Sequence, residues 1–294
     1  MDRRHSCFVV VAPLGILSPF RSPNRAGGRV SLRERQRIAA AVLRECRDAL
    51  ARGDSTILHQ ATGAAGDIAA WRRYPEGEVY DPQTHCQYFY HSHGGPEPAD
   101  SNGRREHGHF HLFLRADGLP AGMTPLVLPE LAVADAPLPP QSAPLKRGGR
   151  DEVVHLVALA LDAHGEPVRL FTTNRWVTGE TWYRAEDVIR MLDRFQVSGE
   201  GSTELLNRWL TAMVQLFQPE IAVLLRHRDR AVTEWRWRRR SNVFEDPRLE
   251  ITSSFPIDLE ARLAAAQDRG VEPAFSAAAP SGYRPPRLAE GWGV

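Results

Sequence analysis

Histidines recur at every second position in two nearby segments of this chain. The sequence reads His-Ser-His at 91–93 and His-Gly-His-Phe-His at 107–111. Side chains on a β-strand alternate between the two faces of a sheet, so each segment would place its histidines on one face of a strand. Aromatic residues, which favour strands, accompany both segments. The pattern predicts two neighbouring antiparallel strands, over 87–93 and 107–114, that share a histidine-lined face.

The clustering is far from an even distribution. Six of the 11 histidines lie between residues 85 and 111, where an even spread over 294 residues would place about one. Neutral imidazoles crowded on one face lose solvation and protonated ones repel each other, so a binding partner must offset that cost. A metal ion is the simplest partner. A metal-free hydrogen-bond network that responds to pH is one alternative, and a coincidence of solvated histidines is the other.

The predicted metal ligands are the histidines that share this face. Alternate residues on a strand lie about 6.6–6.8 Å apart, which lets two imidazoles lean toward one ion. Ligation by imidazoles with few thiolates favours a transition metal, Zn or Fe with Cu or Ni as alternatives, over Mg or Ca. The five predicted ligands are His91, His93, His107, His109 and His111.

Three further residues are candidates for an additional ligand or for a group that supports a ligand from behind. Glu97 follows His93 by four residues, and Glu106 directly precedes His107 on the opposite strand face. His155 lies inside the apolar run Val-Val-His-Leu-Val. It is a core histidine unless its strand lies beside the histidine pair.

A second polar segment covers residues 172–183. It brings together hydroxyls, an amide, a guanidinium, a carboxylate and aromatic rings. Loops of this kind often line binding sites, and the candidates for substrate contact are Asn174, Arg175 and Glu180. The alternative is a structural corner in which tryptophans anchor the loop on the core and Arg175 pairs with Glu180.

The remaining sequence predicts an α+β fold, with a mainly antiparallel sheet that carries the histidine-lined face, flanked by N-terminal and C-terminal helices. A capping box, Ser31-Leu-Arg-Glu34, predicts a helix through about Arg52. A hairpin is expected from 153–161 and 167–173. Further helices are expected over 55–73, 185–195, 203–227 with a break at Pro219 and a continuation to 240, and 259–269.

One α+β domain is expected over residues 31–270, between a poorly ordered leader at 1–30 and a disordered tail at 271–294. The net charge of +1 gives no bulk attraction for nucleic acid, so a nucleic-acid partner is not expected. Three widely spaced cysteines without a C-x-x-C pair favour a cytoplasmic protein. The apolar run at 7–17 leaves export as the alternative, and it is too short to span a bilayer.

Several stretches together resemble an uncharacterised bacterial family of unknown function. The likeness covers about residues 31–265, and it implies a single domain and a bacterial source without implying an activity. The stretches that carry it are His91–His93, Glu106–His111, Asn174–Tyr183 and Asn242–Asp246.

A shorter likeness is to the cupins. His91, His93 and Glu97 form H-x-H-x3-E, which resembles the first cupin metal motif over about a dozen residues. The glycine expected six residues before the first histidine is replaced by His85, and no second cupin motif follows.

Together these features predict a metal-binding protein that acts as a metal-dependent enzyme on a small molecule bound near residues 174–180. Hydrolysis and redox chemistry are both open, as is the oligomeric state. The alternative is a non-catalytic metal-binding or interaction protein, with a structural ion or a metal-free histidine cluster.

Overall fold

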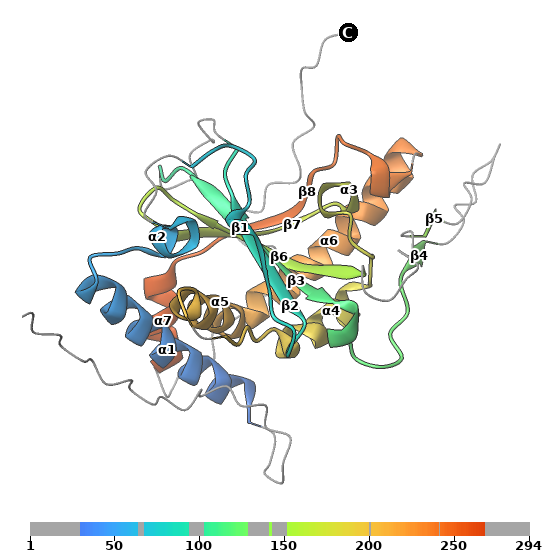
Figure 1. Ribbon diagram of the computed structural model, residues 1–294. Helices are drawn as coiled ribbons and strands as arrows, with labels where there is room; N and C mark the ends of the chain where they lie inside the picture. Colours follow the sequence, from blue (N-terminus) through green and yellow to red (C-terminus); the bar gives the residue numbers. More distant parts are fainter. Residues whose placement is uncertain are drawn as a thin grey trace, which may run out of the picture.

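The computed structural model describes residues 30–63, 68–93, 103–128, 141–142, 152–199, 201–240 and 242–267. Its centre is a six-stranded sheet in the order β1-β2-β3-β6-β7-β8, in which each neighbouring pair is antiparallel (Figure 1). The strands are β1 (Tyr74–Tyr80), β2 (Cys86–His91), β3 (Gly108–Arg115), β6 (Val153–Leu161), β7 (Pro167–Thr173) and β8 (Ile251–Pro256). Two short strands, β4 (Val127–Leu128) and β5 (Gln141–Ser142), pair separately.

The long helices cover one face of this sheet. They are α1 (Leu32–Arg52), α4 (Ala185–Met191), α5 (Glu204–Leu216), α6 (Gln218–Arg239) and α7 (Leu259–Gln267), with the short α2 (Ile57–Thr62) beside them. The four-residue α3 (Arg175–Thr178) follows β7 and is not one of these helices. Figure 1 shows α1, α5 and α7 gathered together below the sheet. The main hydrophobic cluster joins these helices to strand side chains such as Tyr88, Phe110 and Leu156. The predicted α+β fold with an antiparallel sheet is therefore confirmed.

Several local predictions are confirmed because their signals are short-range. The Ser31 hydroxyl caps α1 by accepting the Glu34 backbone N–H at 3.2 Å. The predicted hairpin is β6 and β7, closed by the Gly165 N–H, which donates to the Asp162 carbonyl at 3.0 Å. Pro219 lies in the first turn of α6, which gives the predicted break after α5.

The helix predicted over 55–73 is wrong in extent. In the described residues α2 ends at Thr62, and the chain enters β1 at Tyr74. Pro75 and Gly77, which directly follow the predicted helix, lie within β1. Proline cannot donate to a strand ladder, but β1 is an edge strand of the sheet, where a missing donor is tolerated.

The face of the sheet opposite the main hydrophobic cluster, here called the open face, carries the histidines. Alternation along β2 and β3 directs one set of side chains to the helices and the other to the open face. In β6 this alternation is interrupted: Leu112 pairs with Val157 and Phe113 with His155, so Leu156 is an extra residue. The bulge keeps His155 on the open face although Val157 packs in the main cluster.

None of the helices in the described ranges is both long enough and apolar enough for a bilayer crossing. The predicted leader, except Val30, and the predicted tail at 271–294 lie outside the described residues.

Candidate metal centre

Three imidazoles meet on the open face of β2 and β3. His91 and His109 are register partners, and His111 lies two residues further along β3. One ring nitrogen from each of the three lies within 4.8 Å of the others. The two Nε2 atoms of His91 and His109 are 2.8 Å apart. Two nitrogens bound to one tetrahedral zinc ion would be about 3.3 Å apart, so a small outward movement of these rings would admit an ion.

Glu106 supports His109 from behind. Its Oε1 lies 2.5 Å from His109 Nδ1, and its Oε2 pairs with the guanidinium of Arg169. Burial alone would raise the pKa of Glu106, but the hydrogen bond from His109 and the charge of Arg169 hold it below its ordinary value. Because an ionised carboxylate can only accept, His109 Nδ1 carries a proton, and this hydrogen bond turns Nε2 of His109 toward His91. This is the arrangement in which histidine ligands of metals are commonly held.

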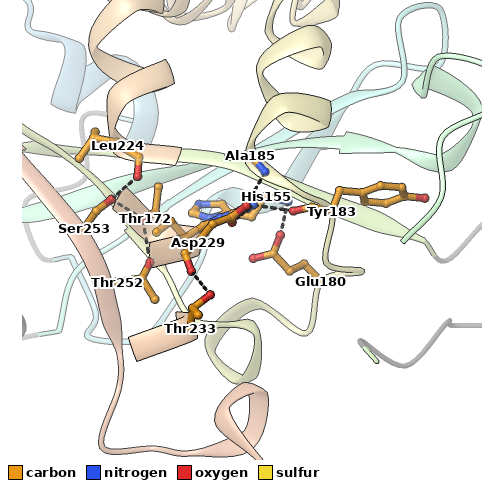
Figure 2. A network of polar contacts seen from close by, with 11 residues as sticks. His155, Thr172, Glu180, Tyr183, Ala185, Leu224, Asp229, Thr233, Thr252 and Ser253 are labelled. Atoms are coloured by element: carbon orange, nitrogen blue, oxygen red, sulfur yellow. Dashed lines mark hydrogen bonds and ion pairs between the residues drawn. The ribbon is translucent and has the colours of Figure 1, made fainter. Parts of the chain in front are cut away.

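His155 extends the cluster on its buried side. Its Nε2 lies 3.1 Å from His111 Nδ1, and its Nδ1 lies 3.5 Å from the Thr173 hydroxyl. The backbone N–H of His155 donates to Glu180 Oε2 at 3.0 Å, and Figure 2 shows the two residues side by side. With Nδ1 of His111 directed at His155, Nε2 of His111 remains for an ion. His155 therefore fits a supporting position better than a ligand position.

Burial keeps three of the clustered histidines neutral. Burial, reinforced by His109 and His93, lowers the pKa of His91 to about 3. Burial also lowers the pKa of His111 well below its ordinary value, and burial with Arg228 lowers that of His155 to about 3. Neutral imidazoles are the form that binds metal ions, so these three rings need no deprotonation near pH 7.

The other predicted ligands are divided by the structure. His93 follows β2 and lines the same cavity as the three histidines, with its ring centroid 5.0 Å from that of His91 and 5.1 Å from that of His109. His107 precedes β3, and its Nδ1 lies 2.8 Å from the hydroxyl of Tyr90, a member of the helix-side cluster. The structure therefore places His107 away from the cavity. Glu97 lies outside the described residues.

A cavity of about 690 Å³ opens above the histidines. Its floor is the open face of the sheet, and its lining combines aromatic rings with arginines. Trp71 at the rim is 69% exposed and stacks on His93 with centroids 4.5 Å apart. A cavity in which aromatic rings surround convergent polar groups is typical of a small-molecule site. Further lining residues are Arg73, Phe89, Phe113, Arg115, Arg169 and Phe171.

The loop after β7 reaches this cavity, but not through the three predicted substrate-contact residues. Asn174 is fully buried and caps α3, with its amide donating to the Val243 carbonyl at 2.7 Å. Arg175 pairs with Glu245 rather than with Glu180. Glu180 is 1% exposed, and burial raises its pKa to about 7. The loop residues that line the cavity are Trp176, Val177 and Thr178.

Sequence reasoning missed the arginines of the cavity wall. For Arg169 a signal existed, because it alternates with Phe171 on a strand of the predicted hairpin. No sequence pattern pointed to Trp71 or Arg73 as cavity residues, because a helix was predicted over these positions.

Comparison with known proteins identifies a family for this chain but no activity. No curated protein and no solved structure matches this chain. The family model described as a domain of unknown function, DUF6969, matches residues 37–257, which include every described residue of the histidine cluster and the cavity wall. This agrees with the resemblance to an uncharacterised family. The chain belongs to the DUF6969 family.

Proposed function

We propose that the protein binds a transition metal ion, Zn or Fe with Cu or Ni as alternatives, and acts as a metal-dependent enzyme on a small molecule in the cavity. The ligands are His91, His109 and His111, with His93 as the candidate for a fourth. The observation that carries the proposal is the convergence of three imidazole nitrogens within 4.8 Å at the floor of a cavity. An ion there would supply Lewis-acid or redox chemistry.

The surroundings of the three histidines support an ion over a purely structural role. Glu106 orients His109, so that Nε2 faces His91 rather than the protein interior. Phe89 and Phe171 pack against the histidine rings and limit their movement. The cluster also borders a cavity, so a bound ion would be accessible to a ligand.

The direct test is metal content. Protein purified without a polyhistidine tag is reconstituted with Zn, Fe, Cu or Ni and subjected to elemental analysis. We expect about one ion per chain in the wild type and none in H91A/H109A. The matched control is H59A/H164A, which removes two exposed histidines and should bind as the wild type does. Circular dichroism checks folding, and H91N, a milder change, should weaken binding without abolishing it. Failure of the wild type to take up any of the four metals would contradict the proposal.

A non-catalytic role is the second candidate, favoured by one observation. The contacts His91–His109 and His111–His155 already satisfy ring nitrogens without an ion. Cobalt-substituted protein separates the two. If azide titration changes the visible spectrum of the cobalt ion, the ion has an accessible position, as a catalytic site needs. An unchanged spectrum would indicate a closed structural site.

A further inference from the structure

Beyond the histidines, the cavity floor along β2 and β3 contains two largely buried aromatic rings, Phe89 and Phe113. Phe89 pairs with His111 across the two strands, and Phe113 pairs with Gln87. The rings of Phe89 and Phe113 stack with centroids 5.7 Å apart and an interplanar angle of 28°. An aromatic group in the cavity would meet the edges of these two rings, in the edge-to-face contact that aromatic pairs favour.

Two guanidinium groups stand over the far side of this floor. Arg73 lies over the Phe89 ring at 4.3 Å, and its guanidinium donates to Glu78 at 3.2 Å. Arg115 lies 3.6 Å from the same carboxylate and also donates to the Gln87 side chain. Two guanidiniums therefore share one carboxylate, which gives this end of the cavity a net positive charge.

The opposite end has a different balance. Arg169 pairs with Glu106, so the charges beside the histidines cancel. A guanidinium has five N–H donors, and the single contact of Arg73 with Glu78 leaves donors that a ligand can use. Arg73 thus offers an anion a charge-assisted hydrogen bond at a water-accessible position.

The spacing limits the size of the ligand. The Phe89 ring, which lies under Arg73, has its centroid 5.7 Å from that of His91 and 5.3 Å from that of His111. One six-membered ring with a substituent at each end covers that distance. An aliphatic chain would leave the edges of Phe89 and Phe113 without an aromatic partner.

From this arrangement we infer that the cavity takes a planar aromatic carboxylate, an inference that rests on the proposed metal site. The ligand ring packs against the edges of Phe89 and Phe113, and the carboxylate meets Arg73 and Arg115. A polar substituent at the other end of the ring points to the histidines. The aromatic carboxylate is thus the class of substrate, and a bound ion would supply the chemistry of the reaction.

The first test uses 4-hydroxybenzoate as the probe in calorimetric titrations of zinc-loaded protein. Two analogues change one property each: 4-hydroxybenzamide removes the charge, and 4-hydroxycyclohexanecarboxylate removes the planarity. We expect the acid to bind about tenfold more tightly than the amide, since a hydrogen bond to a charged group is worth about 1.5–3 kcal/mol. The saturated acid should bind several-fold more weakly than the aromatic one. Equal affinities for the acid and the amide, or no binding of the acid, would overturn the inference.

Two variants of the wall should act in opposite directions. R73Q should weaken binding of the acid about tenfold and leave the amide within about twofold. E78Q should tighten binding of the acid several-fold, because both guanidiniums lose their competing carboxylate. R190Q, which breaks an exposed ion pair with Asp187 on α4, is the control and should change neither affinity. Weaker binding of the acid by E78Q would overturn the inference.

Metal content is measured on each sample, so that failure of the proposed function can be distinguished from failure of the ligand inference. If zinc is absent from the wild type, the proposed function fails, and the same titrations on metal-free protein still report the preference for acid over amide. If zinc is present and that preference is missing, the inference on the ligand fails alone.

Discussion

At the scale of single residues, Glu106 connects the histidine cluster to the rest of the cavity. Its side chain is 8% exposed, yet its carboxylate is ionised because His109 and Arg169 each contact one oxygen. Without the carboxylate charge, His109 and Arg169 would each lose a charged hydrogen-bond partner at a poorly solvated position. Glu106 is therefore the carboxylate on which the orientation of His109 depends.

The variant E106Q should bind zinc about 10–100-fold more weakly than the wild type, because the amide holds His109 less firmly and lowers its basicity. Competition with a chelating dye measures the dissociation constant. E234Q, at an exposed carboxylate on α6, is the control. Unchanged zinc affinity in E106Q would show that Glu106 has no part in holding the ligand.

The metal-free protein should lose stability as the pH falls below about 6.5. His91 and His155 have pKa values of about 3 in the folded protein and the ordinary value of 6.5 when unfolded. Between these values the unfolded chain binds more protons, so acid favours unfolding by about 1.4 kcal/mol per pH unit for each such histidine. Urea titrations at several pH values compare the wild type with H91N. The wild type should decline more steeply by about that amount, and parallel curves would contradict the assignment.

At the scale of elements, prediction succeeded where the signal was local. The capping box of α1 and the turn of the β6–β7 hairpin depend on residues three or four apart. Prediction failed for β1, where Pro75 and Gly77 break the alternation, and for β8, where Thr-Ser-Ser in the middle gives no alternation at all. Both are outer strands whose places depend on a partner distant in sequence.

The histidine-lined face was likewise predictable only as far as local signals reach. Alternation along β2 and β3 was enough to bring His91, His109 and His111 together. It could not show that His107 lies before the strand begins, or that a bulge at Leu156 keeps His155 in phase with them. Of the cavity-wall arginines, Arg115 ends β3 itself, whereas Arg73 precedes the edge strand β1 and Arg169 lies on β7, so only the tertiary structure brings these last two to the histidines.

The β2–β3 pairing at the cluster depends on a glycine. A Cβ at Gly108 would lie 2.4 Å from the His91 carbonyl oxygen and 2.5 Å from the Tyr90 hydroxyl. G108A should therefore lower the free energy of unfolding by about 2 kcal/mol or more and weaken metal binding. The control G53A, at the end of α1, meets nothing closer than 3.5 Å and should change stability by less than about 0.5 kcal/mol. Urea titration measures both, and equal effects would contradict the steric argument.

At the scale of the whole molecule, the sheet separates two kinds of surface. One face joins the helices in the main hydrophobic cluster, and the other holds imidazoles, guanidiniums and stacked rings over a cavity. The proposed ligands come from β2 and β3, which lie inside the sheet rather than at its edge. Binding of an ion there would therefore be coupled to the folding of the entire sheet.

Zinc should therefore stabilise the protein globally. With free zinc about 100-fold above its dissociation constant, the free energy of unfolding should rise by about 2.7 kcal/mol. Thermal unfolding with and without zinc measures the shift, and a chelator should reverse it. H164A should behave as the wild type, whereas H91A/H109A should show no shift. A zinc-dependent shift in H91A/H109A would place the ion elsewhere.

The alternation of side chains across β2 and β3 has a consequence for the history of such a chain. Every second residue contributes to the buried cluster that stabilises the fold, and the residues between them face the cavity. Substitutions at the second set can replace one chemistry by another while the first set remains intact. Related chains can therefore differ in reaction and ligand yet keep the same architecture, and their activities have to be read from the cavity residues one by one.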